Sequence, residues 1–85
     1  MIPKLTNAIP KPNYILNLEF DNKIWKSFSV EPYFKYPVFK LLADELFFRN
    51  LKVKYNTVVW GQDEDIDFDP YTFWMESIVI EVKYN

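Results

Sequence analysis

The chain contains no histidine, no cysteine and only one glycine in 85 residues. Without histidine it lacks the commonest general base and the commonest metal ligand. Without cysteine it can form neither a disulfide nor a thiolate metal site. A single glycine is too few for a glycine-rich loop that cradles a phosphate. Because the Ser-His and Cys-His arrangements are also excluded, we expect a protein that is not an enzyme and that uses no cofactor.

Long apolar runs are missing as well. No stretch is long enough to span a membrane, and three prolines interrupt residues 1–12, so the start of the chain does not have the form of a signal peptide. Nothing in the composition demands an oxidising compartment. The sequence therefore predicts a soluble, cytoplasmic protein, and its length predicts a single domain over residues 1–85.

Aromatic residues are abundant, with eight Phe, six Tyr and three Trp. Each large ring buries on the order of 150–250 Å², and this is more ring surface than a core of this size readily hides. We expect part of it to form an exposed patch of the kind that marks an interface or a groove. The alternative is that several tyrosines simply lie on the surface with their hydroxyls in water.

Charge is distributed unevenly although the net charge is only −2. Residues 1–55 carry nine Lys/Arg and five Asp/Glu, whereas residues 56–85 carry one Lys and seven Asp/Glu. Such asymmetry can steer a charged partner or let two copies dock head to tail. A solvated face explains it equally well.

Alternating apolar and polar residues predict two hairpins. Residues 14–20 and 24–30 form the first, with Asp21-Asn22 at the turn, because both residue types tolerate a left-handed backbone. Residues 51–60 form the second, with Asn56 at its turn. Further strands are expected at residues 2–9, ended by Pro10, and at residues 78–84. The only glycine, Gly61, is expected at a positive φ.

Two short helices complete the predicted fold. Apolar residues recur at helical spacing between Leu41 and Arg49, and Asn50 is expected to close this helix. Asp69 followed by Pro70 is a helix-start signal, and apolar residues on one face of the following helix are Tyr71, Trp74, Met75 and Ile78. The predicted class is α+β, a small antiparallel sheet of two hairpins plus edge strands, with two short helices.

The order of these elements resembles a small bacterial family known as "domain of unknown function 2442". The resemblance covers residues 2–74, and its most distinctive part is a Val-Val-Trp strand followed by an Asp-hydrophobic-Asp-Pro helix start, here Asp67-Phe68-Asp69-Pro70. This chain departs from the family in having Gly61-Gln62-Asp63 after the tryptophan and a loop about two residues longer. The resemblance implies a compact α+β domain without assigned catalytic residues. It also implies a role beside another small protein in a toxin–antitoxin-like pair.

An acidic segment at residues 63–69 is the one candidate metal site. Asp65, Asp67 and Asp69 have the spacing of the first three ligands of a calcium loop. The sixth position of such a loop requires glycine, however, and Pro70 stands there with its φ locked. An EF-hand is therefore excluded, and a weaker Ca²⁺ or Mg²⁺ site competes with a solvated loop whose carboxylates favour the start of the following helix.

Basic residues alternate with aromatic residues between Tyr33 and Tyr55, a composition that can track a single nucleic-acid strand. The chain is acidic overall, however, and these aromatics fall on apolar spacings, so core packing explains them more simply. Nucleic-acid binding is therefore not expected.

The favoured hypothesis is a non-enzymatic module that binds a small protein partner or a second copy of itself, and the resemblance implies that it is half of a bacterial toxin–antitoxin-like pair. Aromatic residues are enriched at interface centres, and short strands leave sheet edges open. The candidate contact residues are Trp25, Tyr33, Tyr36 and Trp74. The alternative hypothesis is a small-molecule or cation pocket near Trp60 and the acidic loop at residues 63–69.

Overall fold

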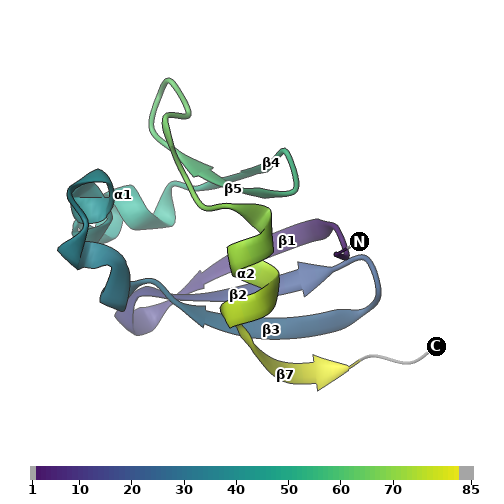
Figure 1. The fold of residues 1–85 in the computed structure, drawn as a ribbon. Helices are drawn as coiled ribbons and strands as arrows, with labels where there is room; N and C mark the ends of the chain where they lie inside the picture. The colour runs from purple at the N-terminus through teal and green to yellow at the C-terminus, as the bar shows by residue number, and fades with distance from the viewer. Residues whose placement is uncertain (1, 83–85) are drawn as a thin grey trace.

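The computed structural model describes residues 2–82 and contains two antiparallel sheets (Figure 1). The larger sheet has the strand order β1 (Leu5–Lys11), β2 (Ile15–Phe20), β3 (Ile24–Ser29), β7 (Ile78–Val82). The smaller has the order β4 (Lys52–Lys54), β5 (Thr57–Trp60), β6 (Ile66–Asp67). The helical elements are 3₁₀ helices η1 (Pro12–Tyr14), η2 (Glu31–Lys35) and η3 (Pro37–Ala43), and α-helices α1 (Glu45–Arg49) and α2 (Pro70–Glu76). The predicted α+β class is confirmed.

Strands β2 and β3 form the predicted first hairpin, but its turn differs from the prediction. The left-handed residue is Lys23, with φ 70°, rather than Asp21 or Asn22. The side chains of those two residues accept hydrogen bonds instead. Asn22 Oδ1 accepts from the amide of Ile24, and Asp21 Oδ1 accepts from the amide of Lys4. The side chain of Asn22 and the backbone hydrogen bond from the Lys23 amide to the Phe20 carbonyl therefore hold the turn, whereas Asp21 connects it to the segment before β1.

Strand β1 continues through Pro10 to Lys11, where the sequence predicted it to end. Pro10 lies opposite Leu16 of β2. Because β1 pairs only with β2 and forms one edge of the larger sheet, a residue without an amide proton is tolerated there.

The helix predicted from Leu41 to Arg49 is divided in two. The residues up to Ala43 form the 3₁₀ helix η3, and α1 begins only at Glu45. Asp44 between them is extended, with ψ 116°, and its carboxylate accepts hydrogen bonds from the amides of Leu46 and Phe47. An N-cap aspartate in mid-segment therefore outweighs the helical spacing of the apolar residues.

The second hairpin agrees with the prediction. Tyr55 and Asn56 both have positive φ, as a tight two-residue hairpin turn requires. Gly61 follows β5 with φ +92°, which confirms its predicted backbone conformation.

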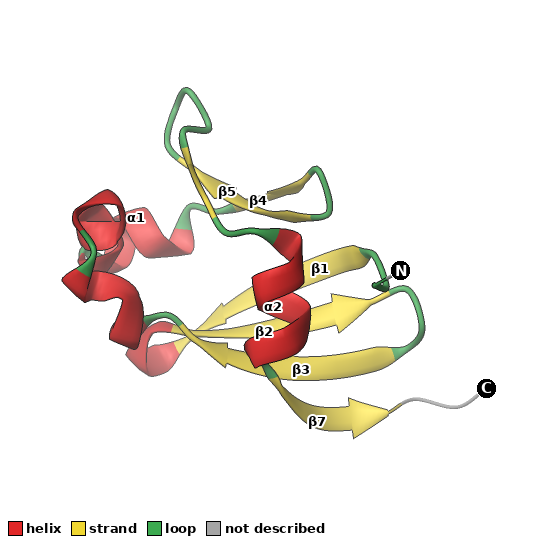
Figure 2. Ribbon diagram, in the orientation of Figure 1, coloured by secondary structure: helices red, strands yellow, loops and turns green. Residues whose placement is uncertain are grey.

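Helix α2 crosses the face of the larger sheet (Figure 2). Asp69 caps it as predicted, accepting a hydrogen bond from the amide of Tyr71 at 2.8 Å. The residue that it buries is Phe73, whereas Tyr71 and Met75 are 58% and 56% exposed. The prediction that Tyr71 and Met75 belong to the packed face of this helix is therefore wrong. The helix packs through Phe73, which is fully buried, and through the half-buried Trp74, which belonged to the predicted face.

Many of the aromatic side chains pack together in one internal cluster centred on Phe68. Its ring contacts five others, those of Phe28, Tyr33, Phe39, Trp60 and Phe73, at centroid distances between 4.4 and 6.0 Å. Phe39 stacks on Phe68, Phe73 is tilted against it, and the other three rings meet it edge-on, so the rings cover one another's surface. Among the described residues, the aromatic side chains that are more than one-third exposed are Tyr36, Tyr55 and Tyr71. No helix in residues 2–82 is long and apolar enough to cross a membrane.

Candidate functional site

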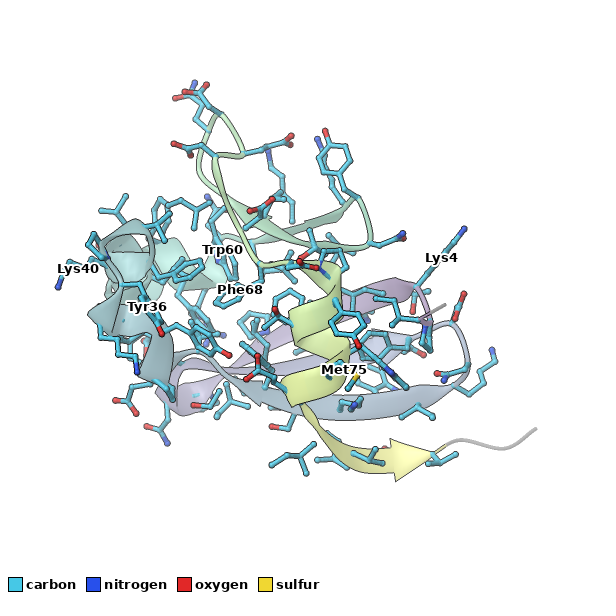
Figure 3. All side chains as sticks on the ribbon, viewed as in Figure 1. Lys4, Tyr36, Lys40, Trp60, Phe68 and Met75 are labelled. Carbon is cyan, nitrogen blue, oxygen red and sulfur yellow. The ribbon has the colours of Figure 1, made fainter. Side chains whose placement is uncertain are left out.

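Two hollows meet beside α2, and Tyr33 and Tyr36 line both of them. The first has a volume of about 490 Å³ and is otherwise lined by Ser27, Phe28, Ser29, Pro32, Lys35, Glu76 and Ile78. The second has a volume of about 390 Å³ and is otherwise lined by Val38, Phe39, Asp67, Phe68, Asp69 and Thr72. We call the two hollows together the tyrosine groove. Figure 3 shows Tyr36 and Phe68 at this part of the molecule.

One side of α2 supplies a wall of the groove. The N-cap Asp69, Thr72 and Glu76 are spaced by three and four residues, so they lie on the same side of the helix. Phe73 points instead into the core. Asp67, at the end of β6, adds a further exposed carboxylate to the second hollow.

The two tyrosines differ in how far their side chains are buried. Tyr33 is half-buried, and its ring lies 5.4 Å from that of Phe28 and 5.1 Å from that of Phe68. Tyr36 is 47% exposed, and its ring centroid lies 6.2 Å from that of Tyr33. The groove thus has one ring packed against the core and one ring that is about half exposed.

Burial raises the pKa of the Tyr33 phenol, and the neighbouring carboxylate of Glu76 raises it further. A negative charge on Glu76 disfavours a second negative charge on the phenolate. Tyr33 therefore remains a neutral hydrogen-bond donor in this groove over the physiological pH range.

The charge of the groove is graded along its length. The first hollow contains one carboxylate, Glu76, and one ammonium group, Lys35. The second contains the carboxylates of Asp67 and Asp69 without a lining Lys or Arg. The Lys35 ammonium lies 5.3 Å from the centroid of the Tyr36 ring, so this ring already faces a cation from its own chain.

The structure brings together two of the four predicted contact residues. Trp74 is not in the groove, because its ring packs edge-on against Phe20 at 5.0 Å and against the Lys26 ammonium at 4.1 Å. Trp25 lies on β3, where its neighbours Lys26 and Phe28 point toward α2, so Trp25 points to the other side of the sheet. Its indole N–H is buried without a hydrogen-bond partner among the described residues.

The three carboxylates of the candidate cation site are not assembled. Within residues 2–82 no group of three or more His, Cys, Asp or Glu side chains is placed to hold a metal ion. Asp69 is used as the cap of α2, and Asp65 Oδ1 lies against Gly61, 2.9 Å from the position of an added Cβ.

Trp60 is buried rather than open to a ligand. It is 1% exposed, and its indole N–H donates to the carbonyl of Phe48 at 2.8 Å. A hollow of about 260 Å³ does lie next to it, lined by Phe47, Asn50, Lys52, Val59, Gly61 and Gln62, but the Trp60 ring does not line this hollow.

Two features of the surface were missed by reasoning from the sequence. The first is the side of α2 that carries Thr72 and Glu76, for which the spacing from Asp69 was the available signal. The second is β7, in which Ile78, Val79, Ile80 and Val82 are between 40% and 73% exposed. The alternation predicted a strand over residues 78–84, which the structure confirms for Ile78–Val82, while residues 83–84 lie outside the described residues. It did not predict that the side chains of this strand are exposed on both faces.

The fold and the groove define a small α+β domain with an acidic, aromatic surface hollow. The chain belongs to the family described as "Protein of unknown function (DUF2442)", whose model matches residues 5–75 and so confirms the resemblance. No curated protein and no solved structure matches the chain.

Proposed function

We propose that this domain is a non-enzymatic, cytoplasmic protein-interaction module, and that its tyrosine groove binds an arginine-bearing segment of a small protein partner. The observation that carries the proposal is the second hollow, where the carboxylates of Asp67 and Asp69 stand beside the rings of Tyr33 and Tyr36. As partner we propose the other small protein of a bacterial toxin–antitoxin-like pair, the role that the resemblance in the sequence implies.

Arginine fits this combination better than other side chains. Its planar guanidinium stacks on aromatic faces and pairs with carboxylates through two parallel hydrogen bonds. The exposed ring of Tyr36 offers the stacking face, and Asp67, which is exposed, offers the carboxylate. Arginine and tyrosine are also enriched among the residues that dominate binding energy at interfaces.

Rigidity of the groove favours binding as well. Tyr33 is held by three neighbouring rings, those of Phe28, Phe39 and Phe68, and does not need to be ordered when a ligand arrives. A site that is already ordered loses less entropy on binding.

The test is a titration of isotope-labelled protein with a capped tri-arginine peptide, followed by the backbone amide resonances. The control peptide carries neutral citrulline in place of arginine. We expect chemical shift changes at Tyr33, Tyr36, Asp67 and Thr72 with the arginine peptide only. Tyr36→Ala and Asp67→Asn should each weaken binding about tenfold, the size expected for a contact at an interface centre.

Matched control variants lie outside the groove. Tyr71→Ala removes another exposed tyrosine, and Asp63→Asn removes another exposed carboxylate from the acidic loop. The proposal fails if these controls weaken binding as much as the groove variants, or if the citrulline peptide binds equally well. The same four variants, used as baits in affinity capture from the native lysate, show whether a cellular partner depends on the groove.

A further inference from the structure

The larger sheet has one edge that is open and apolar. Strand β7 ends the strand order β1-β2-β3-β7, so its outer side pairs with no strand in the described part of the chain. All five of its residues are exposed, and four of them are aliphatic: Ile78, Val79, Ile80 and Val82. In Figure 1 the strand lies at the border of the molecule, beyond β3 and away from the smaller sheet. Exposed apolar edge strands are templates for pairing with another strand.

The opposite edge of the same sheet is protected. Strand β1 contains Pro10, has an irregular register between Leu5 and Asn7, and ends at the exposed Lys11. Proline and lysine are usual devices that prevent pairing at an edge, whereas an irregular register occurs in both edge strands and does not distinguish them. In the smaller sheet, the edge strand β4 carries the exposed lysines Lys52 and Lys54. Within its described residues, Ile78–Val82, β7 has no proline and no basic residue, and its one charged residue is Glu81, whereas Lys83 lies outside the described residues.

We propose that β7 is a homodimerisation surface, at which two copies of this chain pair their β7 strands antiparallel about a two-fold axis. Because β1 carries Pro10 and Lys11, whereas the described part of β7 has neither a proline nor a lysine, pairing of β7 with β7 is favoured over pairing of β7 with β1. If β7 of one copy paired with β1 of the next, the result would be an open-ended polymer, but Pro10 and the exposed Lys11 of β1 oppose that contact. Pairing of β7 with β7 is self-complementary, closes after two copies, and produces one continuous sheet.

Charge and shape are compatible with the second copy as occupant. Within Ile78–Val82, Glu81 is the only charged residue, and a two-fold register centred on Ile80 places it opposite the uncharged Val79. The register between β3 and β7 is irregular, with Trp25 opposite Glu81 and Lys26 opposite Val79, so Ile80 has no partner on β3. Its side chain, 50% exposed, lies at the middle of the strand and becomes the centre of the contact.

The experiment is sedimentation equilibrium of the intact chain over a range of micromolar concentrations. We expect a dimer of the 10.3 kDa chain. Ile80→Lys places two like charges at the centre of the contact and removes apolar burial, so it should raise the dimer dissociation constant at least about tenfold. Leu46→Lys is the matched control: Leu46 is 82% exposed on α1, and its replacement should leave the dimer unchanged. Both positions are exposed, so both variants should fold, and circular dichroism checks this.

A wild-type chain that is monomeric at the highest concentration overturns the proposal. So does a polymer larger than a dimer, or an equal effect of Leu46→Lys and Ile80→Lys. Hydrogen exchange supplies an independent readout, because the amides of Ile78–Val82 should gain protection as the concentration rises. Tyr36→Ala and Asp67→Asn should leave the dimer intact, so this inference and the proposed function can fail separately.

Discussion

The ammonium group of Lys26 donates a hydrogen bond to the carbonyl of Trp74 and lies 4.1 Å from the centroid of the Trp74 ring. Lys26 is on the face of β3 that points toward α2, and it is only 7% exposed. The carbonyl of Trp74 belongs to the last turn of α2, where carbonyls lack partners within the helix and the helix dipole favours a cation. The buried Lys26 therefore connects the last turn of α2 to strand β3 of the sheet.

Replacing Lys26 by methionine tests this connection. Lys26→Met retains the length of the side chain but removes the donor, and we expect a loss of about 1–2 kcal/mol in the free energy of unfolding. Urea denaturation measures the change, and Lys23→Met, at an exposed turn position, is the control. A more stable Lys26→Met variant would mean that the desolvation of the ammonium, which also lowers the pKa of Lys26, outweighs its contacts.

Tyr33 should make stability fall in alkaline solution. Its pKa is raised in the folded protein, first by burial and then by Glu76. The folded state therefore keeps a proton that the unfolded chain releases near pH 10, so the stabilisation is complete below that pH and is lost as pH rises through the folded pKa. The pKa of Lys26 is lowered, and by the same linkage stability rises with pH in this region.

The contribution of Tyr33 can be separated by difference. Tyr33→Phe retains the ring contacts and the pH dependence of stability that Lys26 causes. Subtracting the free energy of unfolding of this variant from that of the wild type at each pH therefore gives the contribution of the Tyr33 hydroxyl. We expect the difference to shrink above pH 10. Glu76→Gln should lower the pKa of Tyr33, which can be followed by NMR of a labelled tyrosine ring. An unchanged Tyr33 titration in Glu76→Gln would contradict the role of this carboxylate.

Gly61 should not accept a side chain. Its φ is +92°, and a Cβ atom there would stand 2.9 Å from Asp65 Oδ1. Gly61→Ala is expected to cost about 1–2 kcal/mol in the free energy of unfolding, because alanine adopts this backbone conformation only with strain. The double variant with Asp65→Ala removes the close contact and leaves the backbone cost. If Gly61→Ala unfolds at the same urea concentration as the wild type, the turn is not as constrained as its φ indicates.

We expect Asp69 to contribute to stability and Asp67 to contribute to binding but not to stability. Asp69→Ala removes the cap of α2 and should cost about 1 kcal/mol of stability, since its carboxylate accepts the Tyr71 amide. Asp67→Ala should leave the thermal midpoint nearly unchanged, because Asp67 is exposed and no side-chain hydrogen bond is assigned to it. Thermal unfolding of both variants checks the contrast. Equal losses would show that Asp67 also supports the fold.

Calcium and magnesium should not stabilise the protein. The carboxylates of Asp65, Asp67 and Asp69 do not form a group that holds a metal within the described residues. A ligand that binds the folded state raises the thermal midpoint, so millimolar Ca²⁺ or Mg²⁺ should leave it unchanged. A clear rise that Asp65→Asn abolishes would restore the cation hypothesis.

Several features could be predicted from local sequence because local physics sets them. The alternation in residues 15–29 specifies a hairpin, the Asp69-Pro70 pair starts a helix, and a lone glycine takes the positive φ. Two of the four candidate contact residues, Tyr33 and Tyr36, lie together in the groove, and their role as contacts stays a prediction. The prediction of one helix from Leu41 to Arg49 was wrong because Asp44 ends the first part of the segment and caps the second. An aspartate can continue a helix or cap one, and local propensity does not decide between the two.

Sequence by itself determined the class of fold, the family and most of the strands, since a period of two residues and a capping signal act over a few neighbours. Tertiary structure alone decided which apolar residues are covered. Trp60, Trp74 and the rings around Phe68 are drawn inward by contacts between segments far apart in the chain, whereas β7 is left outside because no further strand follows it in the described sheet. Burial depends on what lies across the sheet, and this information is spread over the whole chain.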